Sequence, residues 1–371
     1  MSTPAVGAPA PTRPRVMSLD VARGLFLIAS VTTASALPPS APWMTHPAWF
    51  GVTPYDLIFP LFVTLSGVGL AFAYRSPTRV AVTARRVLVL LSVGVLYTAV
   101  HGDHYQLSTL RVTGVLQLYA LLVLVSAVLH QVTRSAWGWA VVTGVTALVG
   151  AVVYLWAQQQ CPGSLLTPEC NPSRWIDGRL LGEHMYAQGR AGHDPEGLVA
   201  AAGAFLTAAA GTTAGHLVLD ARHGSPRVGV VRLSAWTIAC AAAGVALALV
   251  VEPFKRLWTP SFSLLAGALG LLVLLVAYVL VDVLPRRRAA RLRDRASWPL
   301  VALGRQSLLV YFGSHLLAVL LIRHGEPPLA QRLGEWVPLP GGPEVGFVVL
   351  SLALWWTVAM LLHRAGIYVR A

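Results

Sequence analysis

The stretch PSFSLLAGALGLLVLLVAYVLV, residues 260–281, carries no Asp, Glu, Lys or Arg along its whole length. A helix of about 20 apolar residues crosses the roughly 30 Å hydrocarbon core of a bilayer. Residues 233–251 form a second uncharged run of comparable length. Both stretches therefore predict helices that span a membrane.

The composition extends this prediction to the whole chain. Of its 371 residues, 56% are hydrophobic and 12% are charged, whereas soluble domains carry about 25% charged residues. The alternating pattern of a membrane β-barrel is absent, so the backbone must be satisfied within helices. We expect an all-α polytopic membrane bundle of about ten transmembrane helices. The apolar runs place them near residues 17–37, 54–74, 86–101, 112–130, 137–157, 198–219, 233–251, 260–283, 298–322 and 345–363.

The basic residues indicate the orientation, because cytoplasmic connections carry an excess of Lys and Arg. Such clusters occur at alternate connections: Arg13 and Arg15; Arg75, Arg79, Arg85 and Arg86; Arg134; Arg222, Arg227 and Arg232; Arg286, Arg287, Arg288, Arg291, Arg293 and Arg295; Arg364 and Arg370. This pattern predicts both termini in the cytoplasm and extracytoplasmic loops at 38–53 and 158–197. It also explains the net charge of +13 without a nucleic-acid partner. Lys255 and Arg256, in an outer connection, are the exception.

Two further segments have a distinctive composition. The first residues are rich in Pro and Ala, which predicts a disordered cytoplasmic tail at 1–16 followed by one transmembrane domain at 17–371. Cys161 and Cys170 share the long outer loop, where an oxidising environment favours a disulfide; two free thiols are the alternative. No Walker, Rossmann or zinc-ligand motif is present, so we expect no metal site.

The stretch MTHPAWFGVTPYDLIFP, residues 44–60, lies between two apolar runs. Pro54 suits the first turn of a helix, and Asp56 suits a helix N-terminus, where the dipole favours a carboxylate. A well-capped helix with an interfacial tryptophan pair, Trp43 and Trp49, would account for most of the stretch. That interpretation gives His46 no role.

Five segments, taken in order, resemble the heparan-α-glucosaminide N-acetyltransferase family of transmembrane acyltransferases. They are SLDVARG from Ser18 with HPAWFGVTPYDLIFPLFVTLSG from His46; LRVTGVLQLYALLVLVSAVL from Leu110; the loop from Cys161 with HDPEGLVAAAGAFLTAAAGTTAG from His193; KRLWTPSF from Lys255; and GRQSLLVYF from Gly304. The resemblance covers nearly the whole chain from Ser18, and the composition suggests a bacterial member. It implies transfer of an acetyl group from cytosolic acetyl-CoA to an amino sugar or glycan outside the plasma membrane. It also makes a homodimer reasonable.

The resemblance places the chemistry on His46, in the family motif His-x-x-Trp-x-Gly. The family has an asparagine shortly before this histidine, whereas Ala34 and Ser35 stand closest here. Histidine titrates near neutrality, so His46 can take a proton or carry the acyl group itself. Asp56 either orients the imidazole or only caps its helix.

The remaining polar residues are assigned by the side of the membrane on which they lie. On the cytoplasmic side, residues expected to bind the donor are Asp20, Arg23, Arg305 and Gln306; the alternatives are an Asp20–Arg23 pair and simple packing of Gln306. On the outer side, residues expected to bind the acceptor are Trp49, Arg111, Gln117, Asp194, Glu196, Lys255 and Trp258. Asp194 and Glu196 also suit a helix cap. His315 lies in a predicted span but matches the family pattern poorly, so we do not include it.

Two other functions are compatible with such a bundle. A transporter or flippase of a small polar metabolite would also place Arg and His inside the membrane, although inverted halves are not evident. A non-catalytic relative that binds coenzyme A would keep the fold, and the missing asparagine keeps this possibility open. The enzyme is favoured because His46 lies in its motif.

Overall fold

The computed structural model describes residues 16–38, 41–76, 79–222, 225–284 and 287–369. The tail predicted at residues 1–16 lies outside this part of the chain, apart from Val16. Within the described residues, the secondary structure consists of helices and one isolated bridge between Thr167 and Cys170. The all-α prediction is confirmed.

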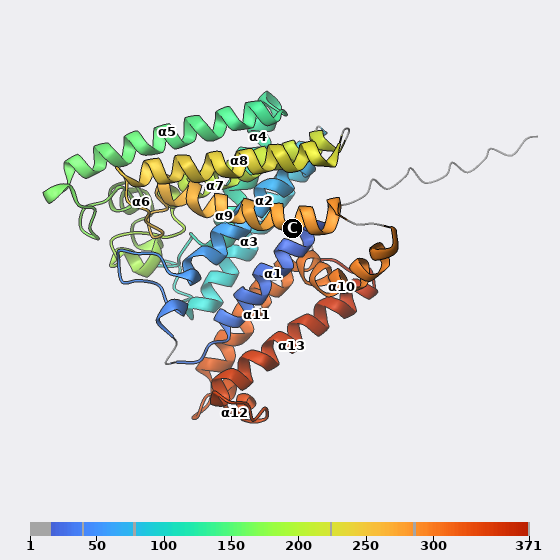
Figure 1. Cartoon of the computed structure of the whole chain (residues 1–371). Coiled ribbons are helices and arrows are strands. Elements are labelled where there is room, and N and C mark those ends of the chain that lie inside the picture. The colour runs from blue at the N-terminus through green and yellow to red at the C-terminus, as the bar shows by residue number, and fades with distance from the viewer. Residues whose placement is uncertain (1–15, 39–40, 77–78, 223–224, 285–286, 370–371) are drawn as a thin grey trace, which may run out of the picture.

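Nine helices of the described chain are long and apolar enough to cross a bilayer. They are α1 (Met17–Ala34), α2 (Pro54–Ala73), α3 (Val80–Gly102), α4 (Val115–Val132), α5 (Ala136–Gln160), α7 (Leu198–Ala221), α8 (Pro226–Ala248), α9 (Pro260–Ala277) with its π-helical continuation Tyr278–Val283, and α13 (Gly342–Arg364). In Figure 1, α5 and α13 lie at opposite edges of the bundle. The multi-pass prediction is confirmed.

The ninth predicted span is broken, so the expected single helix over 298–322 is wrong. Two helices, α10 (Arg287–Arg305) and α11 (Ser307–Arg323), meet at an angle of 67°. Gln306 between them leaves the helical region, with φ −103° and ψ 21°. Its side-chain amide donates to the carbonyl of Ile367 at 2.5 Å and accepts from the backbone N–H of Val369 at 3.3 Å. These contacts hold the C-terminal segment against the break.

Two helices begin earlier in the chain than predicted, because their first turns contain charged residues that the apolar pattern left out. Helix α3 begins at Val80 rather than near 86, and α8 begins at Pro226 rather than near 233. Arginine is a good helix former, so the basic turns extend these helices. Two short helices were not predicted, α6 (Pro172–Leu181) and α12 (Leu329–Glu335). The sequence does contain a helix-start signal for α6: Asn171 is its N-cap and accepts from the N–H of Arg174, and Pro172 follows in the first turn.

Small residues bring the central helices into close contact. A Cβ added at Gly67 of α2 would lie 2.0 Å from the carbonyl oxygen of Ala208 in α7. A Cβ at Gly211 of α7 would lie 2.1 Å from the carbonyl oxygen of Thr64. Such backbone approach is typical of membrane helices, where small residues replace the hydrophobic effect as the basis of packing. Helix α7 is therefore buried along most of its length.

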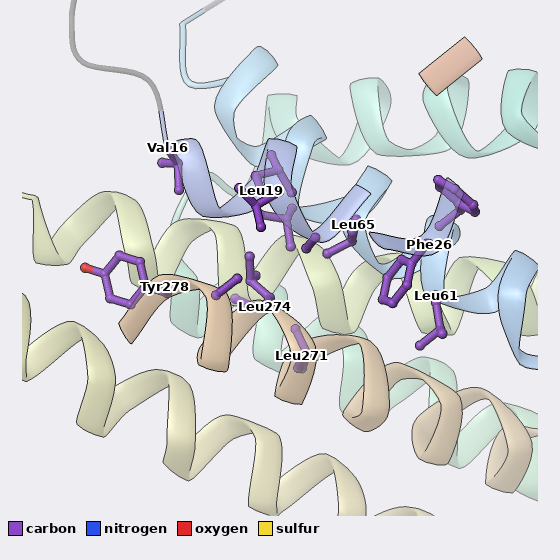
Figure 2. Packing of buried hydrophobic residues seen from close by; sticks show 14 of the residues in the cluster. Val16, Leu19, Phe26, Leu61, Leu65, Leu271, Leu274 and Tyr278 are labelled. Atoms are coloured by element: carbon purple, nitrogen blue, oxygen red, sulfur yellow. The ribbon is translucent and has the colours of Figure 1, made fainter. Parts of the chain in front are cut away.

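A buried apolar cluster joins α1, α2 and α9 (Figure 2). Its labelled members include Leu19 and Phe26 of α1, Leu65 of α2, and Leu271 and Leu274 of α9. This cluster fixes the position of α1 relative to α2. The loop that carries His46 connects these two helices, so the cluster also fixes the two ends of that loop.

The long loop between α5 and α7 is folded rather than extended. The predicted partners Cys161 and Cys170 form a disulfide, with their Cα atoms 5.7 Å apart. Asp177 of α6 accepts hydrogen bonds from the hydroxyl of Ser173 and from the N–H of Leu198, the first residue of α7. Burial raises the pKa of the Asp177 carboxyl above its ordinary value. These contacts attach the loop to the start of α7.

Candidate active site

His46 and Asp56 form a hydrogen-bonded pair at the beginning of α2. Nδ1 of His46 lies 2.5 Å from Oδ1 of Asp56. The other carboxylate oxygen accepts from the backbone N–H of Thr53 at 2.9 Å and from its hydroxyl at 3.2 Å. Asp56 is 1% exposed, whereas His46 is 41% exposed. The two roles considered for Asp56, orienting the imidazole and capping the helix, are both present, one on each oxygen.

This pairing determines which imidazole nitrogen is free to react. Because Nδ1 is directed at a carboxylate, it carries the proton and Nε2 of His46 has the lone pair. The ring also lies against Tyr55, with centroids 4.5 Å apart. A histidine held in this way is suited to accept a proton or to attack a carbonyl carbon through Nε2.

The loop that carries His46 is attached to distant parts of the chain. Arg256 donates to the carbonyl of Pro47 through Nη2 at 2.5 Å and through Nε at 3.1 Å. The indole N–H of Trp49 donates to the carbonyl of Leu166, and its ring packs against Phe254. Trp49 does not line the cavity next to His46, so its position does not support the predicted contact with the acceptor. It anchors the loop instead.

His46 opens into a cavity of about 240 Å³, which we call the outer cavity. Its walls come from the ends of α1, α2 and α3, from α11, and from the loops around them. The lining residues are Ser30, Thr33, His46, Tyr55, Asp56, Ile58, Phe59, Tyr97, Thr98, His101, Arg111, Gly114, Val115, Glu196, Lys255, Tyr311 and His315.

An ion cluster forms one wall of the outer cavity. Arg111 donates to Asp194 at 2.8 Å and to Glu196 at 2.6 Å. Burial alone would lower the pKa of Arg111, but the two carboxylates more than offset burial and raise it. Asp194 is fully buried and also accepts from the hydroxyl of Thr113. Neither acid is the N-cap of α7, which is Gly197.

Two residues predicted to bind the acceptor lie behind the wall of the outer cavity. Trp258 is fully buried, donates to the hydroxyl of Thr207 and packs edge-on against Phe59. Its predicted contact with the acceptor is therefore not supported. Gln117 lies beside Gly94 and Gly114, and both polar atoms of its amide are buried without a hydrogen bond.

A second cavity of about 620 Å³, the inner cavity, lies toward the other end of the same helices. It is lined by Asp20, Arg23, Phe59, Phe62, Ser66, Gly69, Leu70, Phe72, Ala73, Arg86, Leu90, Leu116, Tyr119, Leu122, Val123, Gly304, Arg305, Ser307, Leu308, Tyr311, Phe312 and Val369. Phe59 and Tyr311 line both cavities. The two cavities are therefore stacked end to end and meet at these aromatic residues.

Three arginines line the inner cavity. Arg23 donates to the carbonyl of Leu65 at 3.1 Å, and Arg305 lies over the ring of Tyr368 at 3.6 Å. Arg86 was not selected from the sequence, because it was assigned to a basic loop rather than to α3. Its Nε is buried without a hydrogen-bond partner. Gln306 does not line the inner cavity. It is fully buried, and its amide is bonded to the C-terminal segment, so it packs against that segment rather than binding the donor.

Sequence reasoning also missed several residues of the outer cavity. Ser30 of α1 is 1% exposed, and its hydroxyl has no hydrogen-bond partner. His315 is directed through Nδ1 at the carbonyl of Tyr311, 2.8 Å away, and its ring stacks on that of Tyr311. An ionisable group inside a span is a signal for a functional site, and His315 carries that signal in the sequence. Nowhere in the described chain do three or more His, Cys, Asp or Glu side chains gather as a metal site.

The fold and the site together define a multi-pass helical membrane protein with a histidine–carboxylate pair in the outer of two adjoining cavities. Residues 15–166 match the family model described as heparan-alpha-glucosaminide N-acetyltransferase, catalytic. The chain is 25% identical to the human heparan-alpha-glucosaminide N-acetyltransferase over 96% of its own length and 60% of the relative's. It is 23% identical to the mouse protein of that name, over 82% and 54% of the two chains.

These matches agree with the family resemblance inferred from the motifs, because the family model and both curated relatives carry the same family name. It spans less than two thirds of the length of the curated relatives it matches. The family model covers His46, Asp56 and Arg111 but ends before Glu196 and Lys255. Glu196 and Lys255 were predicted from two later family-like segments, and the structure places both in the outer cavity.

Proposed function

We propose that the protein transfers an acetyl group from acetyl-CoA in the inner cavity to the amine of an amino sugar or glycan in the outer cavity. The observation that carries this proposal is the stacking of the two cavities around Phe59 and Tyr311, with Nε2 of His46 at the outer one. The family resemblance supports the donor and the kind of acceptor. Orientation of the outer cavity toward the outside of the cell is part of the proposal.

The inner cavity suits the donor because its cations complement phosphates. Arg23, Arg86 and Arg305 all line it, and guanidinium groups bind phosphate oxygens through paired hydrogen bonds. Asp20 of α1 lines the inner cavity and Thr33 lines the outer one. At 1.5 Å per helical residue they are about 20 Å apart along the axis. An extended acyl carrier is needed to cover this distance, which fits the long pantetheine arm of coenzyme A.

The chemistry follows from the free nitrogen of His46. As the acceptor amine attacks the thioester carbon, a C–N bond forms, the C–S bond breaks, and Nε2 receives the amine proton and passes it to the departing thiolate. Asp56 stabilises the imidazolium that forms in this step. The same nitrogen could instead carry the acetyl group between donor and acceptor. The direct route places the acceptor amine between Nε2 and the thioester carbon, whereas the second route brings the thioester carbon to Nε2 itself.

The developing oxyanion needs a hydrogen-bond donor, since the family asparagine is absent. The unpartnered hydroxyl of Ser30 lines the same cavity as His46. It is available to donate to the oxyanion without first breaking another hydrogen bond. We assign this role to Ser30 as part of the proposed mechanism.

The test is transfer of label from acetyl-CoA to amino sugars by the purified protein. Wild type is expected to acetylate at least one acceptor, and His46→Ala is expected to abolish transfer while the protein remains folded. His324→Ala is the matched control, because His324 is exposed at the end of α11 and does not line either cavity. Equal rates for His46→Ala and the control would remove His46 from the mechanism. Movement of intact amino sugar across the membrane without acetylation would favour a transporter.

A further inference from the structure

The loop that carries His46 depends on a small number of contacts for its position. None of residues 41–53 is buried. Arg256 binds the carbonyl oxygen of Pro47 through both Nη2 and Nε. Because Pro47 directly follows His46, this contact constrains where the imidazole lies in the outer cavity.

Arg256 is itself bound by His193, a histidine that lines neither cavity. Nη1 of Arg256 lies 3.2 Å from Nε2 of His193, and Nδ1 of His193 lies 2.9 Å from the carbonyl oxygen of Ala191. A guanidinium can only donate a hydrogen bond, and a carbonyl oxygen can only accept one. Nε2 must therefore be the acceptor and Nδ1 the donor. The neutral imidazole with its proton on Nδ1 is the form that satisfies both contacts.

The ring of His193 also touches the loop directly. His193 is 2% exposed, and Trp49 packs edge-on against it, with ring centroids 5.1 Å apart. Trp49 belongs to the loop and donates to the carbonyl of Leu166. His193 therefore contacts the loop at Trp49 and acts on it a second time through Arg256.

Protonation of His193 would place two donors against each other, because a new N–H on Nε2 points at Nη1 of Arg256. Burial lowers the pKa of His193 most, and Arg256 and Lys255 lower it further, whereas its backbone hydrogen bond and Asp194 raise it. Asp194 is not free to bind the new N–H, since each of its oxygens already accepts two hydrogen bonds. The remaining titratable neighbour, Tyr186, presents its ring at 5.9 Å.

We propose that Arg256 and His193 are positioning residues for His46 and act as a proton-sensitive latch: neutral His193 holds Arg256 on Pro47, protonated His193 releases it, and acetyl transfer declines as the pH around this loop falls. This inference rests on the proposed function, because it concerns the position of His46. The proton comes from the solvent, and no covalent bond other than the N–H changes. The latch is complete above the folded-state pKa of His193 and is lost as the pH falls through that value.

The test measures kcat and KM for acetyl transfer at pH 7 and pH 5, at a temperature where each protein is folded. His193→Gln offers Arg256 an acceptor that does not titrate, so it should lose less kcat than wild type on acidification. His193→Lys keeps a permanent cation and should lower kcat about 10- to 100-fold at pH 7, since misplacement by about 1 Å can cost about 10²-fold. KM should change little in both variants, because His193 lines neither cavity.

The matched control is His324→Gln, which changes an exposed histidine at the end of α11. It should keep the wild-type pH profile. Any pH dependence that comes from His46 itself is shared by all these proteins. The difference between wild type and His193→Gln therefore isolates the latch.

Hydrogen exchange provides a second readout that does not depend on turnover. After correction for the intrinsic effect of pH, the backbone amides of residues 41–53 should exchange faster at pH 5 than at pH 7 in wild type. In His193→Gln they should exchange slowly at both pH values. In His193→Lys and Arg256→Ala they should exchange fast at both.

The outcomes separate the two proposals. If kcat falls alike with pH in wild type and His193→Gln, or if their loops exchange alike, the latch is overturned while the proposed function stands. If no acceptor is acetylated, the proposed function fails, and the exchange experiment still decides whether the latch exists. If His193→Gln does not fold, Arg256→Ala decides instead: loop exchange that still rises with acidification in this variant overturns the latch, and pH-independent fast exchange supports it.

Discussion

Replacement of Asp56 by asparagine tests the role of the hydrogen bond to His46 most directly. In the native protein, Oδ1 of Asp56 receives the Nδ1 proton of His46 at 2.5 Å, and Oδ2 receives the N–H of Thr53 at 2.9 Å. Asparagine has one oxygen and one NH₂ group. If its oxygen keeps the helix cap, its NH₂ faces Nδ1, and the imidazole proton moves to Nε2. The nitrogen that should accept a proton then already carries one.

The expected size of this effect follows from the same geometry. In a serine protease triad, the equivalent change lowers kcat about 10⁴-fold because the tautomer is wrong. We expect Asp56→Asn to lower kcat by roughly 10³- to 10⁴-fold for the same reason. Stability should change little, because the cap survives. Asp56→Ala removes the cap as well, and should cost about 0.5–2 kcal/mol more in folding free energy.

The assay measures labelled acetyl transfer and the unfolding temperature for wild type, Asp56→Asn and Asp56→Ala. If Asp56→Asn transfers acetyl groups within about threefold of the wild-type rate, orientation of His46 by the carboxylate is not part of the mechanism. If Asp56→Asn is inactive because the protein unfolds, the unfolding temperature of Asp56→Ala should be at least as low as that of Asp56→Asn. A folded, inactive Asp56→Asn separates the two functions of the carboxylate.

Three further predictions concern the surroundings of this pair. Ser30→Ala should lower kcat roughly 100-fold without loss of stability, because an oxyanion donor is removed and its hydroxyl has no other partner; an unchanged kcat would exclude that role. Gly67→Ala should lower the unfolding temperature, since the new Cβ would lie 2.0 Å from the Ala208 carbonyl oxygen, and such overpacking costs about 1–3 kcal/mol. The pKa of His193 is lowered by burial and by the nearby cations. Wild-type stability should therefore fall as pH drops below about 6.5, toward the lower folded-state pKa. His193→Gln should show a smaller loss between pH 7 and 5, and equal losses would contradict the assignment.

The residues that the sequence placed correctly depend mainly on local patterns. Apolar length locates the spans, and the order Thr53, Pro54, Asp56 indicates a helix start in any context. His46 lies ten residues before Asp56, and the short loop between them brings the two side chains together. The disulfide joins cysteines nine residues apart. In each case the partners are close in sequence.

The features that sequence reasoning missed depend on contacts between distant segments. Gln306 ends a helix because residues 367 and 369 hold its side chain, and no local pattern reports that contact. Trp258 is buried because α2 and α7 pack around its ring, and its indole N–H donates to Thr207 of α7. Arg86 belongs to a cavity wall, although its surroundings in sequence resemble an ordinary basic connection. Such positions follow from how the helices pack, which the hydrophobic pattern does not specify.

The aromatic boundary between the two cavities has a consequence for the cell. Phe59 and Tyr311 are the residues of the described chain that line both cavities, so a direct passage from one cavity to the other runs beside their rings. Narrow apolar constrictions resist wetting, and ions do not readily cross them without water. If the proposed function is correct, such a boundary would let the acetyl group reach the outer cavity while ions are held back, so the membrane potential would be preserved.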